Sequence, residues 1–460
     1  MTHHLIQRYR HSAYNIWSSC LDYRLAVILS ICFVFGGSSQ YAVSYKLFAY
    51  LAALIGIASI LTERHSHDKR KLLNIPFLAG GGVFLLFLLY LVPLPISWTQ
   101  NMPFRHVVVN SYNLIDSGLP SFLSLSMTPE TTYISLLDFL PPFSIALITL
   151  LSSRTREISI TLRTIMLLIV FAAFVGLLQV LLNNPIFYPY EITNFGYPVG
   201  FFANTNHLAT VLVLGILLSL QRIHKINQTS FDNEGSTMVW YFCVLIQLIV
   251  LSLTESIAAV IILLIMLVIV LGLFLLPRVK NIWQRLLFFS VCLLAISFYV
   301  IDFLYLGNNV GSLMAKFNNT ENLSRTEIWA TLLKSREFLS VFGTGPGSFY
   351  EVYLLMSNSS DFTNRYVPHA HNDYLEFYLE LGILGIVVIG LFIFWFLLQI
   401  LKEFKDKTSL NVDTAYLKLA IVVPLLHSIA DYPLRTIAVM SIFIFFTMLQ
   451  VRVNQSSTIN

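Results

Sequence analysis

The sequence has little charge and little cysteine. Only 11% of its residues are charged and the formal net charge is +4, whereas an ordinary soluble domain carries roughly 25% charged residues. No stretch shows a clustered basic face with interleaved aromatic residues, which argues against a nucleic-acid partner. The four cysteines, Cys20, Cys32, Cys243 and Cys292, lie in or beside apolar segments. The sequence therefore predicts neither a disulfide framework nor a thiolate metal site.

Apolar residues, by contrast, make up 56% of the chain and arrive in uninterrupted blocks. The runs "IAAVIILLIMLVIVLGLFLLP" and "LGILGIVVIGLFIFWFLLQIL" exceed the ~18 residues that a helix needs to cross about 30 Å of hydrocarbon. We therefore predict an all-α, polytopic integral membrane protein with about 12 transmembrane helices. The predicted spans are 24–40, 43–61, 74–93, 133–151, 160–182, 201–221, 238–254, 257–276, 286–306, 373–401, 415–430 and 436–451.

The distribution of lysine and arginine predicts the orientation. The basic N-terminus and the connectors "TERHSHDKRK", "SSRTRE", "QRIHK", "PRVKNIWQR" and "LKEFKDK" alternate to one side of the predicted spans. That side should be cytoplasmic, with both termini. No short apolar core with a cleavage site follows "MTHHLIQRYRHS", so we expect the first span to remain in the mature protein. We expect residues 1–460 to form a single membrane domain, with 95–132 and a large periplasmic loop, 307–372, facing outward.

The large loop is expected to contain short helices. In "NNTENLSRTEIWATLLKSREF", Ile328, Leu332 and Leu333 recur at helical spacing beside basic residues, a pattern typical of a helix lying on a membrane surface. The next segment, "VFGTGPGSFYEVY", is too rich in glycine for regular structure. A nucleotide-type phosphate loop is a weak interpretation of it, because no Lys-Ser/Thr ending follows and no strand precedes.

A polar motif, "HAHNDYLEFYLELGILG", opens the next apolar run. If a helix begins near Asn372, then Glu376 and Glu380 follow it on one stripe. Charged groups within a bilayer are costly, so we expect both glutamates to face protein or a wet cavity. Gly382 and Gly385 would allow another helix to approach closely.

His369 and His371 of this motif leave three interpretations open. They could be solvated residues that cap a helix. On an extended segment they could share a face with Asp373 and bind a metal. The third interpretation is general-base chemistry by a neutral imidazole at the water boundary.

Three arginines map to the predicted outer face: Arg325, Arg365 and Arg435. Guanidinium groups bind phosphate oxygens bidentately and keep their charge, so together they would suit a diphosphate head group. Each alone could equally be a snorkelling interface anchor. Arg435 also follows His427 and Asp431 at intervals of four, but the intervening proline favours a turn over a continuous helix.

These motifs together resemble the O-antigen ligase and polymerase superfamily of bacterial membrane glycosyltransferases. The resemblance rests on "HAHNDYLEFYLELGILG", "FGTGPGSF", "SRTEIW" and "GFFANTNHLAT" and extends over residues 120–452. "SLSMTPETTY" and "HSIADYPLRT" are similar to the exopolysaccharide polymerase branch. One position departs from the family pattern, because "LTESIAAV" has Ile257 where an arginine is expected.

The resemblance implies a metal-independent, inverting transfer of a glycan from undecaprenyl diphosphate to an acceptor hydroxyl at the periplasmic face. It needs no cofactor. His371 would be the base, oriented by Asn372 and Glu376. The implied substrate-binding residues are Arg325 and Arg365, with Arg435 in place of the missing arginine. Asn204, Asn206 and His207 would line the cavity, and Asn372 and Glu376 also belong to the implied substrate-binding set.

The acceptor decides the reaction within this superfamily. A ligase transfers the polymer to a lipid A-core acceptor, and a polymerase transfers it to another lipid-linked glycan; the looser motifs favour the polymerase. A protein O-oligosaccharyltransferase is an alternative, and so is a transporter or flippase of lipid-linked oligosaccharide, although no internal repeat of the transporter kind is visible. The resemblance places the protein in the bacterial inner membrane, among membrane lipids, with a periplasmic active site.

Overall fold

The computed structural model describes residues 19–41, 44–62, 72–114, 118–228, 234–275, 325–335, 340–357, 367–405 and 412–457. Helices dominate this part of the chain. They are α2 (Arg24–Phe35), α3 (Lys46–Thr62), α4 (Ile75–Leu91), α5 (Ile96–Thr99), α6 (Arg105–Leu114), α7 (Pro129–Asp138), α8 (Leu140–Leu151), α9 (Thr155–Leu182), α10 (Thr205–Gln228), α11 (Glu234–Leu253), α12 (Ile257–Leu275), α15 (Arg325–Lys334), α16 (Phe349–Met356), α17 (Asp373–Lys405), α18 (Val412–His427) and α19 (Ile437–Ser457).

The prediction of a mostly helical membrane protein is confirmed. Five helical stretches are long and apolar enough to cross a membrane: Pro129–Leu151, Thr155–Leu182, Thr205–Ile226, Asp373–Lys402 and Ile437–Gln455; further apolar helices are shorter. Each predicted span contains a helix except 286–306, which lies outside the described residues. The total of about 12 crossings stays a prediction.

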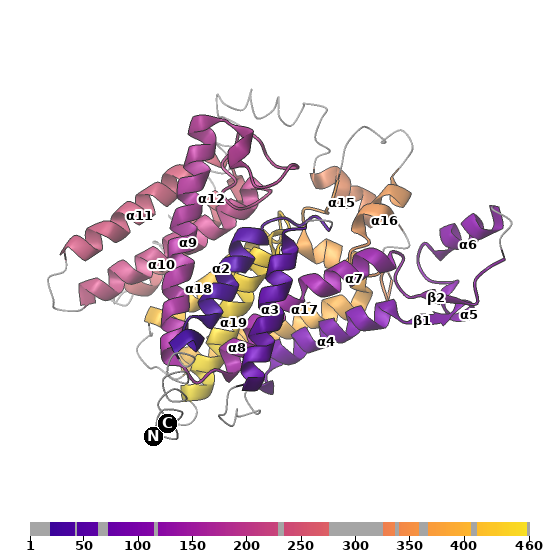
Figure 1. Ribbon diagram of the computed structural model, residues 1–460, viewed down its shortest axis with the longest axis horizontal. Helices are drawn as coiled ribbons and strands as arrows, with labels where there is room; N and C mark the ends of the chain where they lie inside the picture. Colours follow the sequence, from indigo (N-terminus) through magenta and orange to yellow (C-terminus); the bar gives the residue numbers. More distant parts are fainter. Residues whose placement is uncertain are drawn as a thin grey trace, which may run out of the picture.

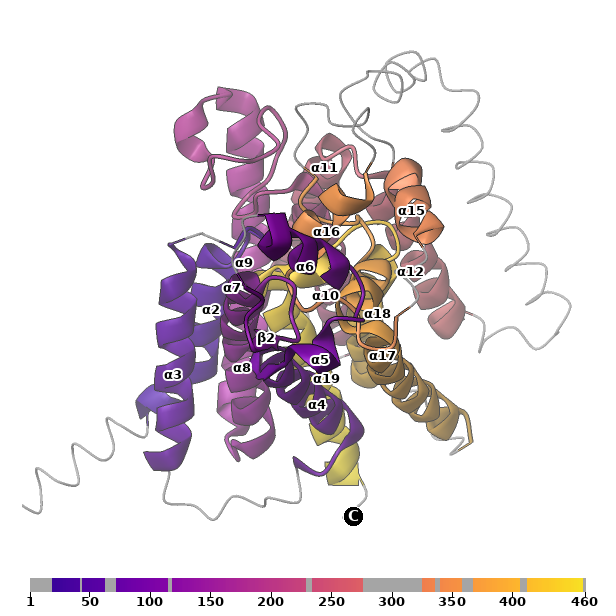
Figure 2. The same ribbon diagram turned by 90° about the vertical axis from the view of Figure 1, so that its right-hand side faces the viewer.

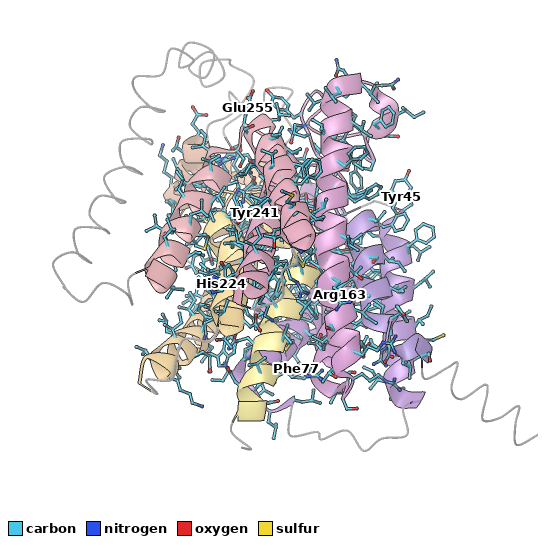
Figure 3. The ribbon with its side chains drawn as sticks, turned by 90° about the vertical axis from the view of Figure 1, so that its left-hand side faces the viewer. Tyr45, Phe77, Arg163, His224, Tyr241 and Glu255 are labelled. Atoms are coloured by element: carbon cyan, nitrogen blue, oxygen red, sulfur yellow. The ribbon has the colours of Figure 1, made fainter. Side chains whose placement is uncertain are left out.

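The helices form a bundle with α19 near its centre (Figures 1 and 2). Helix α10 packs against α9, α11 and α18, while α19 packs against α2, α8 and α18. Most of the apolar stretch of α10 is buried by these neighbours. Figure 3 places Glu255, in the turn between α11 and α12, at the upper end of the bundle, and His224 and Phe77 in its lower half.

At one end of the bundle, α15 and α16 lie above the upper ends of α17 and α18 (Figure 2). A short antiparallel pair of strands, β1 (Pro93–Pro95) and β2 (Phe122–Ser124), projects to the side with α5 and α6 (Figure 1). Buried Arg105 fastens this arm by donating to the carbonyls of Ser124, Leu125 and Ser126.

Helix α17 is broken at Gly382, whose backbone angles are φ 61° and ψ −148°. The glycine-rich segment, residues 341–348, lies against this break. The amides of Thr344 and Gly345 donate to the carbonyls of Leu379 and Glu380. A Cβ on Gly382 would lie 2.3 Å from the carbonyl oxygen of Val341. The prediction that Gly382 admits another helix is therefore wrong, because a loop backbone occupies that space.

Candidate active site

Residues 367–372, which precede α17 and contain His369 and His371, form the histidine segment. Hydrogen bonds hold this segment from two sides. Both oxygens of Glu376 bind it, one 2.7 Å from His369 Nδ1 and the other accepting the amide of Ala370 at 2.8 Å. From the side of α15, the Trp329 indole donates to the Ala370 carbonyl at 2.8 Å. Since Glu376 is fully buried, this segment has a fixed conformation.

His371 follows in that segment and pairs with Asp431. Its Nδ1 lies 3.1 Å from Asp431 Oδ1, and its side chain keeps 26% of its surface exposed while the aspartate is fully buried. The backbone of His371 has φ 50°, a left-handed conformation that is uncommon for a residue with a Cβ. The fixed segment supports this conformation and leaves the second ring nitrogen, Nε2, available to a ligand.

Asp431 is held in its ionised form. Burial alone would raise its pKa, but the hydrogen bond and charge of His371, with the charges of His207 and Arg325, hold the pKa of Asp431 well below its ordinary value. An ionised carboxylate only accepts hydrogen bonds, so the His371 nitrogen that faces it carries the proton. This arrangement leaves Nε2 as the basic nitrogen.

The ring of Tyr432 lies among three imidazoles. Its centroid is 4.3 Å from that of His369, 4.9 Å from His371 and 5.0 Å from His207. The Tyr432 hydroxyl accepts from the Asn204 side chain at 3.3 Å. Tyr432 therefore joins the start of α10 to the histidine segment.

Asn372 occupies the N-cap position of α17. Its side-chain oxygen accepts the amides of Tyr374 and Leu375 at 3.0 Å each, and its amide group donates to the Ile429 carbonyl at 2.9 Å. The predicted start of the helix is thus confirmed. The same side chain ties α17 to the turn after α18 that carries Asp431.

Three carboxylates lie close to the guanidinium of Arg435. This guanidinium lies 2.6 Å from Glu380, 3.5 Å from Glu376 and 3.5 Å from Asp373. Burial alone would lower the pKa of Arg435, but these three carboxylates raise it well above its ordinary value, so the guanidinium stays charged. The prediction that Glu376 and Glu380 face protein is confirmed, since both are buried.

Arg325 begins α15, one helical turn before Trp329. Among the described residues its guanidinium makes no hydrogen bond or ion pair, yet its charge is near enough to lower the pKa of Asp431. The indole of Trp329 thus sets this cation close to the histidine segment. Arg365, the other predicted diphosphate ligand, lies outside the described residues.

The predicted cavity residues at the start of α10 differ in exposure. Asn204 and Asn206 are partly exposed, and the Asn204 oxygen accepts the amide of Asn206 at 2.8 Å. His207 is only 1% exposed and lies behind Tyr432. Only the two asparagines are placed where they could line an open cavity.

Within the described ranges, no group of three or more histidine, cysteine, aspartate or glutamate side chains could hold a metal ion. The nitrogens of His369 and His371 each face a separate carboxylate, Glu376 and Asp431. The glycine-rich segment does not present its amides to a phosphate either, because the Gly347 amide donates to Glu380 at 2.8 Å. The carboxylates of Glu376, Glu380 and Asp431 are therefore engaged by histidines and a backbone amide of the protein itself.

Sequence reasoning missed Tyr432, Trp329 and the pairing of Asp431 with His371. Trp329 carries a usable signal, because it lies four residues after Arg325 and so shares its helical face. The pairing of Asp431 depends on how the turn after α18 packs against residues 60 positions earlier, and periodicity does not report such contacts.

Comparison with known proteins gives one family: residues 242–390 match the model described as O-antigen ligase. The match includes α17 as far as residue 390 and the described part of the histidine segment. No curated protein matches the chain. The predicted resemblance is confirmed for residues 242–390, which are similar to the O-antigen ligase family.

Proposed function

We propose that this protein is a glycosyltransferase that moves a glycan from undecaprenyl diphosphate to an acceptor hydroxyl at the periplasmic face of the inner membrane. The family match supports a membrane enzyme of glycan ligation. One observation carries the finer proposal: the partly exposed His371 is paired with buried Asp431 at the end of a long apolar helix. A lipid-linked donor has its reactive carbon at the membrane surface, where this pair would be needed.

In the proposed reaction, Nε2 of His371 takes the proton from the acceptor hydroxyl as its oxygen attacks the anomeric carbon of the donor. The bond between that carbon and the diphosphate oxygen breaks, and the lipid diphosphate leaves with the electron pair. Asp431 holds the opposite ring nitrogen and stabilises the imidazolium that forms. The attack from the opposite side inverts the anomeric configuration.

The leaving diphosphate needs fixed positive charge as its own charge develops. Arg325 is suited to this, since no described side chain neutralises it and Trp329 holds its helix on the histidine segment. We assign Arg365 the same role by resemblance. Arg435 has three carboxylate partners, so we assign it chiefly to positioning Glu376, with only Nη2 left to reach a ligand.

Asn204 and Asn206 are proposed to contact the sugar or diphosphate from the start of α10. Asn372 and Glu376 are proposed to act indirectly, by fixing the segment that carries His371. The family description leaves the acceptor open between a lipid A-core and another lipid-linked glycan, and the looser motifs favour polymerisation.

The test replaces His371 by alanine in cells that make the lipid-linked glycan, with membrane abundance measured alongside. Loss of the polymer ladder with accumulation of single repeat units would indicate a polymerase, and loss of polymer from the lipid core would indicate a ligase. The matched control is His106→Ala, on an exposed position of α6, which should leave the glycans unchanged. Unchanged glycans in His371→Ala would overturn the assignment of the base.

A further inference from the structure

Four buried polar atoms behind the catalytic pair have no hydrogen-bond partner among the described residues. They are both ring nitrogens of His207, Nε2 of His427 and Oδ2 of Asp431. All three side chains are at most 1% exposed. Buried polar groups are almost always paired, with protein or with ordered water, so this concentration of unpaired atoms in one place needs an explanation.

The three side chains converge from two helices and a turn. His207 and Thr210 lie one turn apart on α10, and Thr210 Oγ1 is 2.7 Å from His427 Nδ1. His427 ends α18, and the amide of Asp431 donates to its carbonyl at 2.9 Å, which places His427 and Asp431 on successive turns. His207 contacts Tyr432, the next residue, edge to face.

The hydrogen bonds of Thr210 determine which nitrogen of His427 carries the proton. Thr210 donates its single hydroxyl proton to the Asn206 carbonyl at 2.9 Å, so towards His427 it must accept, and His427 Nδ1 carries the proton. In the neutral ring, His427 Nε2 is then a bare acceptor. Asp431 Oδ2 is an acceptor as well. Two buried acceptors cannot satisfy each other, but one water molecule can donate to both and accept from the N–H of His207.

We propose that His207, His427 and Asp431 enclose a buried water molecule that sets the proton affinity of His371 through Asp431. The significance of this water for catalysis rests on the proposed function. His427 and His207 would be positioning residues, because neither touches the substrate. Asp431 Oδ1 already accepts from His371 and from the Tyr432 amide, so the water would complete the hydrogen bonding of this carboxylate.

The direction of the effect follows from the charge of Asp431. A water that donates to Oδ2 draws negative charge away from Oδ1, so Asp431 holds the proton on His371 less tightly. The charged and titratable groups facing Asp431 are His371, His207 on α10, Arg325 on α15, His427 on α18 and the adjacent Tyr432. Of these, His427 can be changed without altering either member of the catalytic pair.

The test uses the full-length protein in lipid nanodiscs, labelled with ¹⁵N-histidine. In His427→Leu, which removes the acceptor, the pH midpoint of the His371 signals should move upward by about 0.5 to 1 unit. His427→Gln keeps an acceptor oxygen and should stay near the wild-type midpoint. An unchanged midpoint in folded His427→Leu overturns the proposal.

The tautomer of His427 gives a second test, which does not require His427→Leu to fold. The wild-type spectrum should show His427 protonated at Nδ1 and bare at Nε2, Thr210→Ser should preserve that tautomer, and Thr210→Val should lose it. A proton on Nε2 in the wild type would overturn the water site. These readouts need no substrate: a shifted midpoint without any glycan transfer would refute the proposed function alone, whereas transfer with an unshifted midpoint would refute the water.

Discussion

Two buried arginines show how differently the same side chain is used in this protein. Arg24 meets one carboxylate, with Nε and Nη2 each 3.1 Å from an oxygen of Glu157 and Nη1 2.9 Å from Ser59. Arg435 instead meets the three carboxylates of Asp373, Glu376 and Glu380.

In the second arrangement, each of the three carboxylates also accepts a backbone amide. Glu376 accepts the Ala370 amide, Glu380 accepts the Gly347 amide, and Asp373 accepts the Leu434 amide. The Arg24 pair joins α2 to α9, whereas the Arg435 cluster fixes three irregular segments around His371. The comparison teaches that the ion pair between Arg24 and Glu157 joins two helices of the fold, whereas the cluster around Arg435 shapes the site.

The largest expected effect is a loss of activity when the site around His371 is changed. Asp431→Asn should lower the rate of glycan transfer by about 10² to 10⁴-fold, the range of general acid–base catalysis, because the amide no longer holds the His371 proton. Initial rates in proteoliposomes measure this. Asp22→Asn, which alters a partly exposed ion pair with Arg154, is the control and should stay within about twofold. A similar loss in both variants would refute the catalytic pair.

The reverse pattern, a loss of stability without a loss of activity, is expected at the pair of Arg24 and Glu157. Arg24→Ala should destabilise the protein by about 3 to 5 kcal/mol, because Glu157 is left as a buried unpaired charge. Thermal unfolding in detergent measures this loss. The folded fraction should retain its specific activity, and a selective loss of activity at full stability would contradict the structural role.

Substitution of Gly382 is expected to have an intermediate effect on stability. Gly382→Ala should cost about 1 to 3 kcal/mol from backbone strain, with more from the contact at Val341. Gly81→Ala, in open space on α4, should be neutral or stabilise by up to about 1 kcal/mol. Thermal midpoints of the two variants test this. Equal midpoints would show that α17 does not need its break.

The smallest expected effect concerns pH. Since the pKa of Asp431 is well below its ordinary value, the group contributes stability above the unfolded pKa of about 3.9 and loses it as the pH falls further. The thermal midpoints of the wild type and Asp431→Asn should therefore differ at neutral pH, and the difference should shrink progressively as the pH falls below about 4. Curves that run parallel throughout would contradict the charged state of Asp431.

The sequence alone could predict the features that depend on local pattern. The apolar runs predicted helices, and the position of Asn372 before a glutamate stripe predicted where α17 begins and that Glu376 faces protein. The partners of Arg435 and the pairing of His371 with Asp431 depend on tertiary packing between distant segments, which no local pattern encodes. The break at Gly382 was missed because the hydrophobic run continues through it without interruption.

The central claim is that His371 is the base of glycan transfer from a lipid diphosphate. The most direct test is single-turnover transfer in proteoliposomes, without any ion gradient, from an undecaprenyl-diphosphate-linked glycan to its acceptor. His371→Ala should bind the donor as the wild type does and yet form product at least about 10²-fold more slowly. Product formation at the wild-type rate in His371→Ala would contradict the account.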